Sequence, residues 1–259
     1  MFMSAAPEVR RLWRPAVLLG AVGALASMAV MPYAMALSPA LFARMPLPLP
    51  VFLIVQCVQA IVLLTLLSWA GFRLADAVGL KAPVLHVATG QVALRSLTQR
   101  SLGMAVVAGG LVGLALLVLG KVSEPLIPAT ISSAAPDIAL WKRLLASFYG
   151  GIAEELMCRL FLMSLLVWLA NRFLAHTGAI ADARAMWTGI IGAALIFGVL
   201  HLPAAAALFP LTPMVVARII AMNAIGGVVF GWLYWRRGLV HAMVAHFFAD
   251  IVLHGIGGS

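Results

Sequence analysis

The stretch VFLIVQCVQAIVLLTLLSWAG, residues 51–71, contains no charged side chain. A helix needs about 20 apolar residues to cross the hydrocarbon core of a bilayer, so this stretch predicts a membrane-spanning helix. Comparable apolar stretches occur on both sides of it. The expected spans are residues 15–37, 50–72, 103–120, 144–170, 186–207, 212–234 and 238–257. The sequence therefore predicts an all-α, polytopic bundle of about seven transmembrane helices.

The composition excludes an ordinary soluble enzyme. Hydrophobic residues make up 64% of the 259-residue chain and charged residues 10%, whereas soluble domains have about 45–50% and about 25%. The formal net charge is +9, but the basic residues form short blocks between apolar stretches, which indicates membrane topology rather than nucleic-acid binding. Cys57 and Cys158 lie in separate apolar stretches and predict neither a disulfide framework nor a zinc knuckle.

The basic residues of the loops alternate between a rich side and a poor side. The rich side carries Arg10, Arg11, Arg14, Arg73, Lys81, Arg95, Arg100, Arg172, Arg184, Arg236 and Arg237, and the poor side carries Arg44, Lys121, Lys142 and Arg143. The positive-inside rule then predicts a cytoplasmic N-terminus and an external C-terminus, in a bacterial inner membrane. Ala34-Met35-Ala36 resembles a signal-peptide cleavage site, but the apolar run before it exceeds the usual h-region of about 7–15 residues. A retained first helix is therefore favoured.

Several ionisable residues fall inside the predicted spans: Glu154, Glu155, Arg159, His201, Arg218, His246 and Asp250. A charged side chain at the bilayer centre costs about 2.5–3.5 kcal/mol even on insertion scales, so such residues need partners and are candidates for function. By contrast, His86 and His176 fall in loops, His241 at a helix entrance and His254 near the terminus. The Gly109-x-x-x-Gly113 and Gly227-x-x-x-Gly231 patterns predict close helix packing.

Spacing along the helices pairs some of these residues. Glu155 and Arg159, and likewise His246 and Asp250, are i,i+4 neighbours and share a helix face. Each pair has a structural alternative, an ion pair that fixes helix packing or a hydrogen bond between helices. A histidine such as His201, taken alone, is more often an interface residue held by a hydrogen bond than a catalytic one. Glu154 and His246 both fall near the predicted midplane, so a common site below the bilayer surface is feasible.

Three motifs in this order resemble those of the CAAX-protease and bacteriocin-processing (CPBP, or Abi) family of intramembrane peptidases. They are Glu154-Glu155-x-x-x-Arg159, Phe197-x-x-x-His201 and His246-x-x-x-Asp250, on three separate helices. The resemblance covers roughly residues 140–259, which we treat as the catalytic core, with residues 1–139 supplying N-terminal helices. Asp250 departs from the prenyl-protease branch, which typically has Asn, and is more similar to bacterial relatives.

The resemblance implies peptide-bond hydrolysis within the membrane by a glutamate-activated water. Glu154 would be the general base with His201 beside it, and His246 and Asp250 would bind the carbonyl oxygen. Because an ionised carboxylate cannot donate a hydrogen bond, Asp250 would act protonated or indirectly. Glu155, Arg159 and Phe197 would support these residues.

The expected substrate is a peptide or membrane protein, including prenylated ones, in contact with membrane lipids and not with nucleic acid. No cofactor is expected. One glutamate and two histidines also form a zinc ligand set, but the His-Glu-x-x-His spacing is absent, so a zinc-dependent metalloprotease is the less favoured alternative. A non-catalytic membrane scaffold or immunity-type protein is another. A proton-coupled transporter is disfavoured because no internal repeat is evident.

Overall fold

The computed structural model describes residues 5–80, 99–126, 137–174 and 181–256, which contain helices and no strand. The helices are α1 (Ala5–Ala29), α2 (Met31–Leu37), α3 (Pro39–Ala43), α4 (Leu49–Val78), α6 (Gln99–Ser123), α8 (Leu140–Phe148), α9 (Ser164–Leu174), α10 (Ala183–Leu200), α11 (Leu202–Ala206), α12 (Pro213–Arg237) and α13 (Leu239–Ile256). A 3₁₀ turn, Glu124–Leu126, follows α6. Two π-helical segments, η3 (Tyr149–Glu154) and η4 (Leu156–Met163), join α8 to α9.

Within the described residues, six helices are long and apolar enough to cross a membrane: Leu12–Leu37, Leu49–Val78, Ser101–Ser123, Ala183–Ala206, Pro213–Arg237 and Leu239–Ile256. They coincide with six of the predicted spans. The remaining predicted span, residues 144–170, lies inside the composite α8–η3–η4–α9 segment. The all-α polytopic bundle is therefore confirmed, and the chain is an integral, multi-pass membrane protein.

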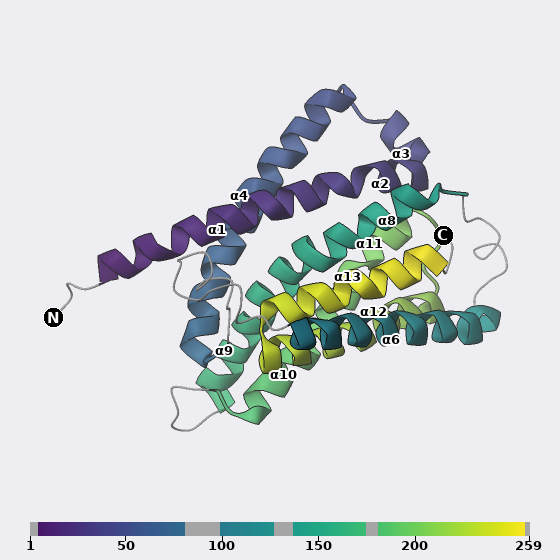
Figure 1. Cartoon of the computed structure of the whole chain (residues 1–259). Helices are drawn as coiled ribbons and strands as arrows, with labels where there is room; N and C mark the ends of the chain where they lie inside the picture. The colour runs from purple at the N-terminus through teal and green to yellow at the C-terminus, as the bar shows by residue number, and fades with distance from the viewer. Residues whose placement is uncertain (1–4, 81–98, 127–136, 175–180, 257–259) are drawn as a thin grey trace.

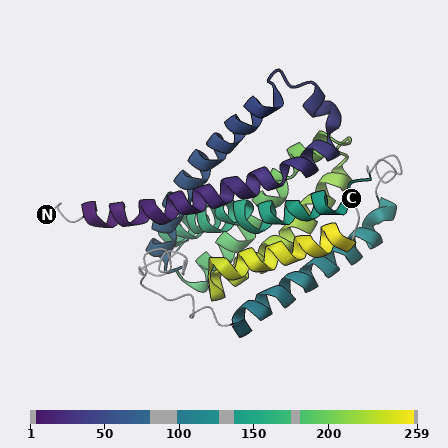
Figure 2. The ribbon, with the colours of Figure 1, turned by 45° about the horizontal axis from the view of Figure 1, so that its top comes forward.

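Helices α1, α6, α8 and α13 run broadly along one direction, whereas α4 crosses α1 steeply, and the N and C labels lie at opposite ends of the molecule (Figures 1 and 2). The principal helix pairs are α1 with α4, α6 with α13, and α10 with α12. The composite segment packs against α4, α10 and α13, so it occupies the middle of the bundle and touches most of the other long helices.

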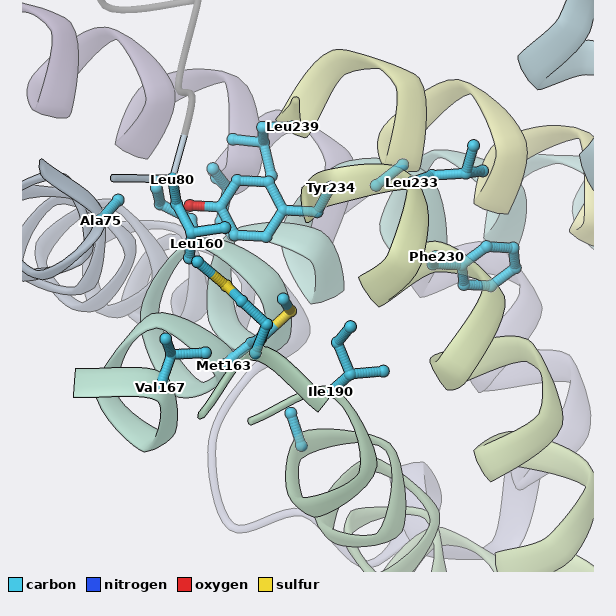
Figure 3. Packing of buried hydrophobic residues seen from close by; sticks show 14 of the residues in the cluster. Ala75, Leu80, Leu160, Met163, Val167, Ile190, Phe230, Leu233, Tyr234 and Leu239 are labelled. Carbon is cyan, nitrogen blue, oxygen red and sulfur yellow. The ribbon is translucent and has the colours of Figure 1, made fainter. Parts of the chain in front are cut away.

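Large apolar side chains cover the outside of the bundle. On α6, for example, Val107 and Leu111 are 61% and 62% exposed. Such exposure would be a liability in water, but in a bilayer lipid tails cover it, because they are as apolar as leucine. Inside, a continuous apolar core joins Leu160 and Met163 of η4 to Ile190 of α10 and Tyr234 of α12 (Figure 3).

Glycines let the helices at the centre approach closely, as the two glycine patterns predict. A Cβ on Gly113 of α6 would meet the carbonyl oxygen of Ala249 at 2.6 Å, and one on Gly109 would meet that of Ala245. On α12, a Cβ on Gly227 would lie 2.8 Å from the Cβ of Ala194 in α10. The predicted close packing is confirmed, and it brings α6 against α13 and α12 against α10.

Candidate active site

The composite segment carries the first group of candidate residues in its π-helical turns. Glu154 ends η3, Glu155 joins the two π segments, and Arg159 lies in η4. π-helical turns are rare and occur frequently at functional sites. Here they coincide with Gly150 and Gly151, where the segment approaches α13 so closely that a Cβ on Gly151 would lie 2.7 Å from Phe247 Cβ. The widened turn therefore sits where two helices meet.

Two other helices supply the remaining candidates. His201 immediately follows α10, and its Nδ1 lies 2.8 Å from the carbonyl oxygen of Phe197 one turn earlier. A carbonyl oxygen only accepts hydrogen bonds, so Nδ1 of His201 carries a proton and donates it. Its Nε2 remains free to face the site. His246 and Asp250 both project from α13, separated by one helical turn.

Glu154 lies between the two histidines. One carboxylate oxygen, Oε1, is 3.8 Å from Nε2 of His201, and the other, Oε2, is 3.7 Å from Nε2 of His246. Both separations exceed a direct hydrogen bond. The three motifs, far apart in the chain, thus converge on one carboxylate.

The second nitrogen of His246 is held by Glu155. Nδ1 of His246 and Oε1 of Glu155 are 2.8 Å apart, whereas Oδ1 of Asp250 is 3.8 Å from Nε2. The i,i+4 spacing in the sequence predicts only that Asp250 shares a helix face with His246. The hydrogen bond instead comes from Glu155, because consecutive residues of the π-helical turn reach opposite edges of the same ring.

Arg159 balances the buried charge of Glu155. Its Nη1 lies 3.3 Å from Oε1 of Glu155, and both side chains are almost completely buried. The guanidinium also lies over two aromatic rings, at 4.7 Å from the Phe197 centroid and 5.5 Å from that of Phe230. Since a buried charge is costly without a partner, these contacts explain how an ion pair persists at the centre of the bundle.

Aromatic rings fix the two histidines. Phe197 makes edge contacts with His201 and His246, with ring centroids 4.6 and 5.8 Å apart. Phe230 stacks on His246 at 4.5 Å with an interplanar angle of 21°. One group of side chains in the site is therefore buried, and the other group is more accessible. The side chains of Glu155, Arg159 and His246 are 0%, 2% and 6% exposed, against 15% for Glu154, 34% for His201 and 14% for Asp250.

Sequence reasoning missed two residues of this site, Phe230 and Gly150. A Cβ on Gly150 would collide with Oδ2 of Asp250 and lie 3.1 Å from Nε2 of His246, so glycine leaves the room that these two side chains occupy. The Gly150-Gly151 pair beside Glu154 was the available signal. Phe230 offered none, because one more aromatic in an apolar helix does not stand out.

Among the described residues, His241 and Cys158 do not join the site. Cys158 is buried, and His241 is buried with neither ring nitrogen hydrogen-bonded. His86 and His176 lie outside the described residues. No group of three or more His, Cys, Asp or Glu side chains suited to holding a metal ion occurs in the described part of the chain.

Comparison with known proteins points to a peptidase family. Residues 136–252, a little under half of the chain, match the family described as "Rce1-like: Type II CAAX prenyl endopeptidase Rce1-like". The matched range contains Glu154, His201, His246 and Asp250, and begins close to the predicted start of the catalytic core. No curated protein and no solved structure matches the chain.

Proposed function

Residues 136–252 match the family model of Rce1-like type II CAAX prenyl endopeptidases, and from this premise we propose that Glu154 activates the water with which the chain hydrolyses a peptide bond. In this proposal the matched residues form a peptidase domain within a membrane protein. The observation that carries the proposed mechanism is the position of the Glu154 carboxylate, with one oxygen toward Nε2 of each histidine.

The Glu154–His201 gap suits a water molecule that hydrogen-bonds to both groups. Nδ1 of His201 donates to the Phe197 carbonyl, so neutral His201 presents an unprotonated Nε2, which accepts. Glu154 also accepts. A water that gives one hydrogen to each keeps an oxygen lone pair free for attack on a carbonyl carbon. Glu154 takes the proton released in this step, as a general base does when it is within reach of the proton.

His246 and Asp250 would bind the carbonyl oxygen as it becomes negative. Because Nδ1 of His246 donates to Glu155, Nε2 can donate only when the ring is doubly protonated, and the neighbouring Glu155 carboxylate stabilises that imidazolium. Asp250 can donate only when it is protonated. Donors already aimed at a developing oxyanion each contribute about 10²–10³-fold to the rate. Glu155 is then a positioning residue for His246, and Arg159 and Phe197 hold Glu155 and the rings.

The proposed substrate is a peptide or a membrane protein, including prenylated ones, that reaches the site from the lipid phase. We further propose that the N-terminus is cytoplasmic and that the membrane is a bacterial inner membrane, because the loops that the sequence places on the same side as the N-terminus carry most of the basic residues. Residues 1–139 would support residues 140–259, which hold the catalytic core. The proposed mechanism uses no cofactor.

The test uses purified protein in detergent and a library of quenched-fluorescent peptides with and without prenyl groups. Glu154→Gln removes the base while keeping the side-chain shape, and we expect cleavage to fall by about 10²–10⁴-fold. His246→Ala should fall comparably. Glu124→Gln, the same change in the 3₁₀ turn after α6, is the matched control and should cleave like the wild type.

The same assay tests the alternatives. Cleavage that survives EDTA and phenanthroline is expected, and its loss would instead indicate the zinc-dependent mechanism with the same glutamate and histidines. Full cleavage by Glu154→Gln would refute the role of this carboxylate. If folded wild-type protein cleaves nothing while Glu154→Gln keeps the cellular phenotype, a scaffold or immunity-type role replaces the peptidase.

A further inference from the structure

The first half of α4, residues 49–63, contains no buried side chain. All buried residues of this helix lie in its second half: Leu64, Thr65, Ser68, Gly71, Phe72, Ala75 and Val78. Figures 1 and 2 show the first half rising away from the other long helices. Its side chains are therefore free to contact lipid or another protein within the membrane.

Two glutamines interrupt the apolar surface of this half. Gln56 and Gln59 lie about 10 Å and about 15 Å along the helix from Leu49, so Gln59 is near the middle of a hydrocarbon core of about 30 Å. The hydrogen bonds formed among the described residues include none to either amide. An amide without a partner is costly at this depth, because the bilayer core holds no water to hydrogen-bond to it.

Gln59 is exposed and lies on the face of α4 that points away from the bundle. At about 100° per residue, Ser68 of the buried face is about 180° away from it. Val55, Val62 and Leu66 are exposed and lie within about 60° of Gln59. The positions 55, 59, 62 and 66 alternate steps of four and three residues, which is the a/d repeat of a coiled coil. A polar residue at an a position of such a repeat specifies register and oligomeric state.

The partner that this stripe fits is the same stripe of a second copy of the chain. A carboxamide carries both hydrogen-bond donors and an acceptor, so two glutamines that face each other satisfy one another, which a lipid tail cannot do. A two-fold axis along the membrane normal makes the two α4 helices parallel and brings identical residues together. No charged residue lies between Arg44 and Arg73, so no like charges oppose the close approach.

We propose that α4 mediates a symmetric homodimer within the membrane, in which Gln59 hydrogen-bonds to Gln59 of the partner subunit. Val55, Val62 and Leu66 pack around this pair as the apolar part of the interface. This inference goes beyond the proposed function, because α4 lies outside residues 136–252 that match the peptidase family. Its test requires no cleavage.

The first experiment measures association in a bilayer. Donor- and acceptor-labelled copies of the full chain are reconstituted together in phospholipid vesicles, and energy transfer between them is followed as the protein-to-lipid ratio falls. Gln59→Leu should raise the dissociation constant of the dimer by about 3- to 30-fold, the contribution of hydrogen bonds between membrane helices. Gln59→Asn keeps an amide and should retain part of the wild-type affinity. Val62→Ala should also weaken association, whereas Val107→Ala, the same change at a comparably exposed position of α6 (61% against 54%), is the control and should not.

Cysteine cross-linking in native membranes maps the face of α4 that forms the interface. Cys57 is first replaced by Cys57→Ser, and single cysteines are then introduced along the helix. Disulfide-linked dimers should form at the four positions of the stripe, Val55, Gln59, Val62 and Leu66. They should be absent at two exposed positions about 140–160° away on the same helix, Ile54 and Ile61.

Three outcomes would overturn the inference. The first is energy transfer in the wild type no higher than random proximity in the bilayer produces, which would leave the stripe covered by lipid alone. The second is equal association of the wild type and Gln59→Leu, or cross-linking without a helical period. The third is a cross-linked product that contains a different protein while copies of the chain show no energy transfer, because the stripe would then bind another membrane helix.

Discussion

At Gly150 we expect the addition of a single methyl group to lower the activity of the site strongly. A Cβ there would overlap Oδ2 of Asp250 and crowd Nε2 of His246. Since Cβ atoms essentially never approach other heavy atoms within 3.0 Å, Gly150→Ala must displace the Asp250 carboxylate by on the order of 1 Å, and a displacement of that size costs roughly 100-fold in rate. Alanine is favoured over glycine in a helix by about 1 kcal/mol, so we expect the variant to remain folded.

The assay measures kcat/KM and thermal unfolding for the wild type, Gly150→Ala and Gly103→Ala. Gly103 is the matched control, because a Cβ there meets nothing within 4 Å, and its substitution should leave both quantities near wild type. Asp250→Ala and the double variant with Gly150→Ala complete a cycle. If the added methyl acts through Asp250, it should lower kcat/KM little further once Asp250 is gone. A folded Gly150→Ala variant with wild-type kcat/KM, or fully additive losses, would refute this reasoning.

Three further predictions concern the stability and topology of the bundle. Arg159→Met leaves the buried Glu155 carboxylate without its guanidinium partner and with His246 alone beside it, so we expect a loss of about 3–5 kcal/mol in thermal or denaturant unfolding. Adding Glu155→Gln should restore part of this loss, and a double variant no more stable than Arg159→Met would contradict the ion pair. Gly109→Leu should lower the free energy of unfolding by about 1–3 kcal/mol or more, because it disrupts the α6–α13 contact. Gly110→Leu is the control, because a Cβ there meets nothing within 4 Å, and its free energy of unfolding should stay within about 0.5 kcal/mol of the wild type. Equal effects of the two variants in the same assay would argue against the packing. Reporter fusions should find the N-terminus in the cytoplasm and the C-terminus outside, and both on one side would exclude an odd number of crossings.

The sequence was sufficient for the architecture because hydropathy and length alone determine where a helix can cross a bilayer. The expected span at residues 186–207, for instance, corresponds to Ala183–Ala206. It also identified the residues that meet at Glu154, since an ionisable group in an apolar span is conspicuous. The motif resemblance is confirmed by the family match, although the catalytic role of each residue stays a prediction.

The partners within the site could not be predicted in the same way. The helical spacing of His246 and Asp250 is a property of one helix, whereas the Glu155–His246 hydrogen bond depends on how α13 lies against the π-helical turn. That turn leaves no mark in the hydrophobic pattern, because a membrane-embedded segment is apolar on nearly every face. Phe230 was missed for the same reason, whereas the Gly150-Gly151 pair was a signal that the sequence did contain.

The π-helical winding also makes the number of residues in this segment as important as their identity. Glu154 and Glu155 reach the two nitrogens of His246 only in the present register, and Arg159 reaches Glu155 from the following turn. Removing one residue between Tyr149 and Glu154 would rotate the preceding helix relative to the carboxylates by roughly 100°, the angle between successive residues of an α-helix. We therefore expect natural variation here to proceed by substitution, while single-residue insertions and deletions are eliminated by selection.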